Sequence, residues 1–341
     1  MMPSLLKRRD HLPSRQKSDR VIIAAGLVSL AVLVVIKIAS PRSPLPYADQ
    51  MRTAARFMEQ ATAIVSSGYV AAGNQIDATI DPNHTGLVGP KNSDLTTTLG
   101  QLEAKRTTTN PNMAALLVHL LHQAGVQPGD TIAVGSSASF PALLLATLAA
   151  ARAMEVYPVV ILSLGASAYG STTVDFNLLS IYQLLLRAGA FAIPPAAISL
   201  GGERDTGQDF EPEVKERLLQ QIQRSGIPFI YEPDLQKNVA RRMKIYQGHS
   251  AAGRISAFVN IGGNYADLGT SALVLEVKPG LNRNLALPAE SERGVLFELA
   301  AQGIPCIHLL FIKGLAMKYG LPWDPIPLPK PGDMLLTNSL L

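Results

Sequence analysis

The residues best suited to chemistry lie in turns rich in glycine and hydroxyl groups. The clearest is Gly135-Ser136-Ser137-Ala138-Ser139, between a predicted strand over 131–134 and a predicted helix over 141–154. Backbone N–H groups at the start of a helix favour a carboxylate or a phosphate. A serine hydroxyl in such a turn could also attack a carbonyl carbon. Capping of the helix by serine, with glycine in the turn, is the structural alternative.

Similar segments follow other predicted strands. Residues 165–173 follow the strand over 159–164, and residues 262–267 follow the strand over 256–261. Because ligands of open α/β sheets bind beyond the carboxyl ends of the strands, we expect these segments to share one site. The predicted substrate-binding residues in these turns are Gly135, Ser136, Ser167, Thr172, Gly262, Gly263 and Asn264. The predicted catalytic residues are Ser137, Ser139 and Asp175.

Two cationic side chains are also candidates for binding a substrate. Lys105 and Arg106 lie near two threonine clusters, 96–98 and 107–109, in a stretch without sustained periodicity. Paired cations can clamp a carboxylate, so we predict that they bind an acidic substrate. A solvated threonine-rich loop is the alternative reading.

Several familiar sites are excluded by their spacing. The turn over 135–139 lacks the lysine of a phosphate-binding P-loop and the final glycine of G-x-S-x-G. The single cysteine, Cys306, rules out a cage built from several cysteines. Asp205 and Asp267 could converge with other carboxylates, but their spacing is not diagnostic of a metal. The sequence therefore predicts no metal site, and any cofactor stays unknown.

The elements that position these residues alternate regularly. Short apolar runs separated by helices of ten or more residues predict a mostly parallel sheet covered on both faces. The predicted fold class is α/β, with a doubly wound (Rossmann-like) sheet preceded by one transmembrane helix. The predicted strands span 131–134, 159–164, 196–200, 227–231, 256–261, 273–277 and 304–309. The predicted helices span 47–70, 111–125, 141–154, 176–187, 213–225, 236–246 and 292–301.

The N-terminal region has the pattern of a membrane anchor. Seven of the 30 lysines and arginines, but only two of the 26 acidic residues, precede residue 38. Sixteen residues from Val21 to Ile36 carry no charge, so we predict a transmembrane anchor over 21–40 with a cytoplasmic N-terminus. A cleaved signal peptide is the alternative, although the apolar run is long for one. The net charge of +4 thus reflects the tail, and no nucleic-acid-binding surface follows from it.

The predicted organisation follows from these segments. It consists of a basic cytoplasmic tail (1–20), the anchor (21–40), a linker with a helix and polar loops (41–110), an α/β domain (111–320) and a proline-rich tail (321–341). The bulk of the chain is expected outside the cytoplasm, tethered to the cell membrane by a single pass.

A resemblance to a known family rests on motifs spread through the outer region. They are Leu95-Thr96-Thr97-Thr98-Leu99-Gly100, Ala104-Lys105-Arg106-Thr107, Asn110-Pro111, the 135–141 turn, Leu164-Gly165-Ala166-Ser167 and Gly262-Gly263-Asn264. Together with the anchor, they resemble the poly-γ-glutamate system protein family, a bacterial membrane-anchored group associated with synthesis of that polymer. The resemblance implies a role in making, exporting, trimming or attaching a γ-linked glutamate polymer, with membrane subunits of a synthase as possible partners. It supplies no established catalytic residues.

Two functions stay open at this point. One is an accessory component that binds or processes the acidic polymer in a pocket at the carboxyl edge of the strands. The alternative is a γ-glutamyl amide hydrolase or transferase that uses a serine of the 135–139 turn. The missing nucleophile signature favours the first, whereas the polar strand-end turns favour the second.

Overall fold

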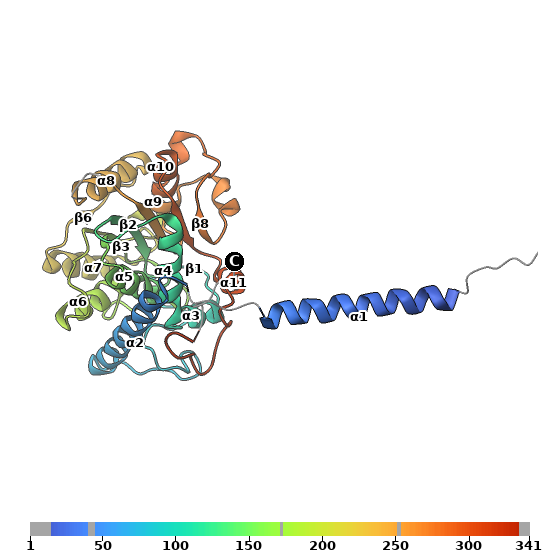
Figure 1. The fold of residues 1–341 in the computed structure, drawn as a ribbon. Coiled ribbons are helices and arrows are strands. Elements are labelled where there is room, and N and C mark those ends of the chain that lie inside the picture. Colours follow the sequence, from blue (N-terminus) through green and yellow to red (C-terminus); the bar gives the residue numbers. More distant parts are fainter. Residues whose placement is uncertain (1–14, 40–44, 171–172, 251–253, 334–341) are drawn as a thin grey trace, which may run out of the picture. The chain divides into compact units, whose positions relative to one another are not determined.

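The computed structural model describes residues 15–39, 45–170, 173–250 and 254–333, and it divides the chain into two compact units. The first, residues 1–43, contains helix α1 (Arg15–Ala39). The second, residues 44–341, contains the remaining helices and strands (Figure 1).

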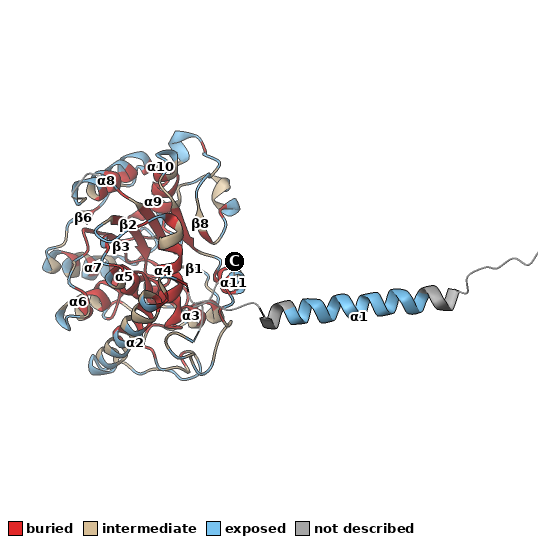
Figure 2. Cartoon of the chain, in the orientation of Figure 1, coloured by how far each residue is buried: buried red, intermediate tan, exposed pale blue. Residues whose placement is uncertain are grey.

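Helix α1 confirms the predicted helical character of this segment but not its crossing of a membrane. All side chains described in it, at residues 19–35, are exposed (Figure 2). Across the described parts of the chain, no helix combines the length and the apolar composition that a membrane crossing requires. The end of the predicted anchor, residues 36–40, lies outside the described side chains. The anchor therefore stays a prediction.

The second unit is an α/β fold around a mostly parallel sheet of seven strands, as predicted. Their order across the sheet is β6-β5-β3-β2-β7-β9-β8, and only β8 runs antiparallel to its neighbour. The strands are β2 (Thr131–Ser137), β3 (Tyr157–Ser163), β5 (Ala197–Ser199), β6 (Phe229–Ile230), β7 (Ala257–Ile261), β8 (Gly280–Asn282) and β9 (Cys306–Leu309).

Apolar side chains form two cores, one on each face of the sheet. The larger core involves α4 (Asn112–Ala124), α5 (Pro141–Ala153), α6 (Leu178–Arg187) and α7 (Pro212–Ser225). The smaller core involves α8 (Leu235–Gly248) and α10 (Val295–Ala301), seen on the other side of the sheet in Figure 1. Strand β2 is buried along its whole length, as expected in a sheet that is covered on both faces.

Helix α2 (Ala48–Ala71) forms a further layer over α4 and α5. Its buried side chains Met51, Ala55, Met58 and Val65 recur at helical spacing and belong to the larger core. The segment over 45–110 thus belongs to the same packed unit as the sheet. Asn112, at the start of α4, donates to the carbonyl of Lys330, so the proline-rich tail also lies against this unit.

The structure differs from the sequence prediction in a few short elements. The strand predicted over 273–277 is not formed: residues 272–276 form a 3₁₀ helix, and the edge strand is β8 instead. The stretch predicted as irregular contains β1 (Thr96–Thr98) and α3 (Leu102–Thr108). Strand β1 pairs with β4 (Ala166–Ser167) in a second, two-stranded sheet. Helices α9 (Tyr265–Leu268) and α11 (Ile312–Lys318) were also not predicted.

Candidate functional site

The order of the strands reverses between β2 and β7. The chain proceeds outward from β2 through β3, β5 and β6, and then returns to the other side of β2 with β7. The connections after β2 and β7 therefore leave the sheet in different directions, and ligands of open α/β sheets bind at such a reversal. The turns after both strands belong to the segments singled out in the sequence.

A pocket of about 270 Å³ lies at this edge of the sheet. Four strand-end turns, after β2, β3, β5 and β7, contribute to its lining, together with β1. The volume corresponds to roughly nine water molecules at about 30 Å³ each, which suits a small polar group. The lining residues are Thr97, Thr98, Ser137, Ser139, Gly165, Gly201, Gly202, Glu203, Asp209, Gly263, Asn264 and Tyr265. We call this the strand-end pocket.

The two predicted catalytic serines that line the pocket differ in their surroundings. Ser137 Oγ lies 3.4 Å from the carbonyl of Ile261. A Cβ at Gly262, where φ is +77°, would lie 2.3 Å from this hydroxyl, so glycine is needed for this close approach. Ser139 Oγ accepts a hydrogen bond from the backbone N–H of Ser167 at 3.0 Å. Ser139 thereby joins the turn after β2 to the loop after β3.

Lys105, predicted to hold a substrate carboxylate, is instead buried beside the pocket. Its exposed fraction is 2%. Nζ donates to the carbonyl of Ser139 at 2.5 Å and lies 2.6 Å from Ser167 Oγ. Burial lowers the pKa of Lys105 from 10.5 to about 7, and among the described residues no carboxylate pairs with it. A large neutral fraction is therefore expected at pH 7.

Six other predicted site residues within the described structure do not line the pocket: Gly135, Ser136, Ser167, Gly262, Arg106 and Asp175. Arg106 pairs with Asp324 of the C-terminal tail through two hydrogen bonds, so the predicted cation clamp is not formed. Asp175 is 79% exposed and pairs with Arg217. Ser136 is buried, with its hydroxyl 3.4 Å from the carbonyl of Ser137. Thr172 lies outside the described residues.

Behind the pocket lies a fully buried polar network centred on Arg242. Its guanidinium is 2.7 Å from Asp205 and 3.2 Å from Asp267, and all three side chains are inaccessible to solvent. Burial alone lowers the pKa of Arg242, but the two carboxylates more than offset this and the net shift is upward. Arg242 therefore stays charged. Ser163 and Ser199, at the ends of β3 and β5, complete its hydrogen bonds.

Asn264 connects this network to the strand-end pocket. Its amide donates to Ser163 Oγ at 2.7 Å and to Asp205 at 3.1 Å, and its carbonyl oxygen caps α9 by accepting from the N–H of Asp267. Because both ends of its amide are used in these bonds, Asn264 positions the pocket wall. The network thus fixes the turns after β3, β5 and β7 relative to one another.

Asp267 is the less satisfied carboxylate of the network. Its Oδ2 has no hydrogen-bond partner in the described structure. Burial raises the pKa of Asp267 to about 6, opposed by Arg242 and reinforced by Asp205. A Cβ at Gly135 would lie 2.5 Å from Oδ2, so this predicted binding residue instead makes room for the carboxylate.

The lining of the strand-end pocket is polar and carries negative charge. Hydroxyls of Thr97, Thr98, Ser137 and Ser139 are the neutral hydrogen-bonding groups, while Glu203 and Asp209 supply negative charge. No histidine, lysine or arginine lies among the described lining residues. No group of three or more histidine, cysteine or acidic side chains suited to a metal was found in the described parts of the chain.

Sequence reasoning missed the role of Arg242. A signal was present, because Arg242 falls on the same helical stripe as Leu235, Val239 and Tyr246, which are buried in α8. A charged residue within a buried stripe requires a buried partner. Serines ending the apolar strands β3 and β5 were the complementary signal.

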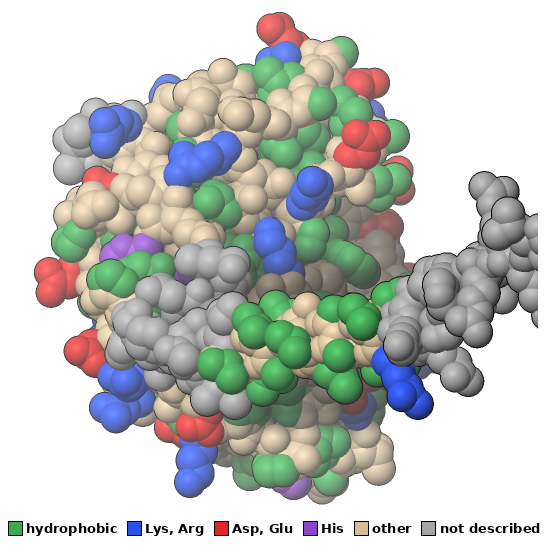
Figure 3. All heavy atoms as spheres, turned by 45° about the vertical axis from the view of Figure 1, so that its right-hand side comes forward, with side chains coloured by type: hydrophobic (Ala, Val, Ile, Leu, Met, Phe, Trp, Pro, Cys, Tyr) green, Lys and Arg blue, Asp and Glu red, His purple; other side chains and the backbone are tan. Residues whose placement is uncertain are grey.

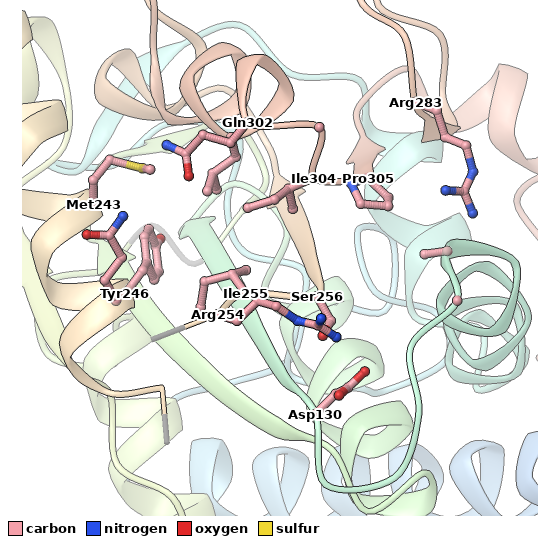
Figure 4. A pocket seen from close by; sticks show the side chains of 15 residues that line it. Asp130, Met243, Tyr246, Arg254, Ile255, Ser256, Arg283, Gln302, Ile304 and Pro305 are labelled. Atoms are coloured by element: carbon pink, nitrogen blue, oxygen red, sulfur yellow. The ribbon is translucent and has the colours of Figure 1, made fainter. Parts of the chain in front are cut away.

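Larger cavities lie elsewhere in the fold. The cavity in Figure 4, of about 450 Å³, is lined by Asp130, Ser256 and Pro305, which directly precede β2, β7 and β9. It therefore lies at the amino ends of the strands, opposite the edge where α/β sheets bind ligands. Its arginines, Arg254 and Arg283, come from separate loops, and Arg283 already donates to a helix carbonyl. We therefore assign the candidate site to the smaller strand-end pocket.

The remaining guide to function is similarity to known proteins. Comparisons with protein-family models, curated proteins and solved structures found no match.

Proposed function

We propose that this chain is a membrane-anchored, extracytoplasmic component of poly-γ-glutamate synthesis or export, and that it binds or processes the polymer in the strand-end pocket. One observation carries this proposal. Segments that support the resemblance to the poly-γ-glutamate system family, at 95–100, 135–141, 164–167 and 262–264, all supply lining residues of the same pocket. Motifs far apart in the sequence would be expected to converge in this way if they served one ligand.

Charge favours one part of the polymer. Each residue of the polymer carries a carboxylate, but the charged residues of the lining are Glu203 and Asp209, both exposed and both acidic. They repel carboxylates and attract an ammonium group. The pocket is therefore suited to the amino end of a γ-glutamyl chain, whose amide groups would bond to the serine and threonine hydroxyls.

Binding of defined oligomers tests this proposal. Short γ-glutamyl oligomers with a free amino end and their N-acetylated counterparts are titrated calorimetrically into the full chain. We expect the free oligomer to bind at least about tenfold more tightly, equivalent to about 1.4 kcal/mol. Glu203→Gln should remove most of this preference. Equal affinity for both oligomers would contradict the ammonium assignment, and no binding of either would contradict the function.

A blocking substitution provides the matched control. A Cβ at Gly263 would meet only Leu268, at 3.8 Å, so the fold has room for a side chain at this lining position. Gly263→Leu should weaken oligomer binding. Gly248→Leu, at the end of α8 with no atom within 4 Å of the added Cβ, should leave it unchanged. Equal loss in both variants would point to a folding defect instead.

The enzymatic alternative is favoured by the two serine hydroxyls in the lining. In this alternative, the chain hydrolyses or transfers γ-glutamyl amides with a serine of the 135–139 turn. Incubation with the polymer, followed by measurement of chain length and released amines, tests it. Unchanged polymer alongside retained binding would favour the accessory role.

The anchor has separate support. Apolar side chains of α1 such as Val21, Leu27 and Leu33 are each more than 60% exposed, and Figure 3 shows such side chains along the helix. A helix that is apolar all round is stable when lipid or protein covers it. We expect the full chain to stay in the membrane fraction after alkaline extraction, and a chain starting at residue 44 to be released. Release of both would contradict the anchor.

A further inference from the structure

Lys105 and Ser167 form a buried pair that the functions above do not use. The amine of Lys105 lies 2.6 Å from Ser167 Oγ, close enough for direct proton transfer. The second contact of Nζ, with the carbonyl of Ser139, fixes its direction. The ring of Phe140, with its centroid 3.8 Å from Nζ, covers the amine.

The environment of Lys105 favours a base over a structural cation. A buried ammonium is stable when carboxylates surround it, and none pairs with Lys105 among the described residues. Burial lowers its pKa to about 7, which makes the amine available as a proton acceptor. The face of the Phe140 ring attracts a cation. The Phe140 ring would therefore stabilise the ammonium that forms when Lys105 accepts a proton.

Ser167 lies next to the strand-end pocket. Its register partner in β1, Thr98, lines the pocket, as does Gly165, two residues before it. The backbone N–H of Ser167 donates a hydrogen bond to Oγ of Ser139, another lining residue. A Cβ at Gly100 would lie 2.3 Å from the carbonyl oxygen of Ala168 and 3.2 Å from Ser167 Oγ, so glycine at this position allows the backbone after β1 to approach Ser167 closely.

We propose that Ser167 is a nucleophile and Lys105 its general base, acting on an amide carbonyl bound in the strand-end pocket. For its substrate, a γ-glutamyl amide, this assignment rests on the proposed function. It places the nucleophile at the end of β4, whereas the enzymatic alternative above uses a serine of the 135–139 turn. Serine–lysine pairs are an established alternative to the serine–histidine arrangement.

The reaction balances with these two residues and water. Neutral Lys105 takes the Oγ proton as Oγ bonds to the carbonyl carbon, and the ammonium returns that proton to the leaving nitrogen as the C–N bond breaks. The product is an ester of Ser167 and a free amine. Water then attacks the ester carbon and gives a proton to Lys105, which passes it to Ser167 Oγ as the C–O bond breaks. An amine in place of water would give transfer.

Among the residues that the structure describes, no comparable base contacts Ser136, Ser137 or Ser139. The contact found for the Ser137 hydroxyl is the carbonyl of Ile261, and that for Ser136 is the carbonyl of Ser137. Ser139 Oγ accepts an N–H. A carbonyl oxygen can accept a hydrogen bond but does not remove a proton from a hydroxyl at neutral pH.

A covalent probe tests the pair independently of the polymer. The full chain is treated with an alkyl fluorophosphonate, which bonds to an activated serine oxygen with loss of fluoride, and the adduct is located by mass spectrometry. We expect one adduct, on Ser167. Ser167→Ala should abolish it, and Lys105→Met should slow labelling by about 100-fold or more. Thr147→Val, which removes a buried hydroxyl bonded to the carbonyl of Leu143 within α5, should label normally.

Lys105→Arg separates a base from a structural cation. Arginine keeps the positive charge and can donate to the Ser139 carbonyl, but it does not deprotonate. If Lys105 is the base, labelling of this variant, measured where it is still folded, stays as slow as in Lys105→Met, while its permanent charge without a counter-ion lowers the thermal unfolding temperature. Labelling at the wild-type rate in Lys105→Arg would overturn the proposal.

Two other results would also overturn it: an adduct on Ser137 or Ser139, or no serine adduct on the wild type. Polymer binding measured on Ser167→Ala distinguishes the two proposals. Retained binding in a protein that forms no adduct would leave the proposed function standing without the serine–lysine pair. Labelling of Ser167 without any polymer binding would support the pair and reject the polymer as its ligand.

Discussion

Two buried cations next to the same strand-end turns have opposite surroundings. Arg242 is fully buried between the carboxylates of Asp205 and Asp267, with serines at the ends of two strands as further partners. Lys105 is nearly as buried, but its partners are a carbonyl, a hydroxyl and an aromatic ring. Arg242 therefore holds its charge, whereas burial lowers the pKa of Lys105 to about 7.

This difference separates a structural cation from a chemical one. A buried cation with counter-ions stabilises the geometry around it, because removing it leaves carboxylates unpaired. A buried lysine without counter-ions destabilises the folded state whenever it is protonated. Such destabilisation is typical of functional sites, where the neutral amine can act as a base. The following predictions test whether Arg242 and Lys105 divide in this way.

The largest effect is expected for Arg242→Met. This change leaves Asp205 and Asp267 buried without a cation, and breaking a buried pair in this way costs about 3–5 kcal/mol. Urea unfolding at pH 7 measures the loss. Combining Arg242→Met with Asp205→Asn and Asp267→Asn should recover part of the stability, because the uncompensated charge is removed. A loss below about 1 kcal/mol in the single variant would contradict the structural role of Arg242.

Lys105→Met should behave differently, through its dependence on pH. The folded pKa of Lys105, about 7, lies below the unfolded value of 10.5, so between these values the unfolded chain binds more protons. The free energy of unfolding should then rise with pH in this window, by roughly 1 kcal/mol per pH unit for one proton. The same rise should be missing in Lys105→Met. Parallel pH profiles of the two proteins between pH 7 and 10 would show that Lys105 is not desolvated as described.

The two cations also differ in how visible they are in the sequence. The α/β class and most strands follow from short apolar runs and helical spacing, which are local signals. Arg242 interrupts a buried helical stripe and could have been recognised. Lys105 lies in the polar helix 102–108, where nothing local marks it as buried; its burial results from packing against residues 139, 140 and 167.

Long-range pairing explains the other differences from prediction. Residues 273–277 have the apolar character of a strand, yet the edge position of the sheet is taken by Gly280–Asn282. Gly280–Asn282 form a strand because they pair antiparallel with β9. No local pattern in these three residues indicates that pairing. The convergence of four turns on one pocket was predictable, because it follows from parallel strand ends. Which side chains point into that pocket was not.

Asp267→Asn tests the one weak point of the Arg242 network. Burial raises the pKa of Asp267 to about 6, above its unfolded value of 3.8, so the folded chain holds the proton more strongly. The stability that this proton provides is fully present below about pH 4 and is lost as pH rises through 6. The unfolding free energy of the wild type should therefore fall relative to that of Asp267→Asn over this window, because asparagine does not titrate. A constant difference from pH 4 to 7 would mean that Arg242 keeps Asp267 ionised throughout.

The smallest effect is expected for a third cation, Arg106. It forms a bidentate salt bridge with Asp324 near the surface. The hydrogen bonds and charge of Asp324 raise the pKa of Arg106, while partial burial acts in the opposite direction. Their side chains are 14% and 18% exposed, so solvent weakens the attraction. A double-mutant cycle with Arg106→Ala and Asp324→Ala should give a coupling of about 1 kcal/mol or less, which falls further in high salt. A coupling as large as the loss in Arg242→Met would show that burial is not what distinguishes the three cations.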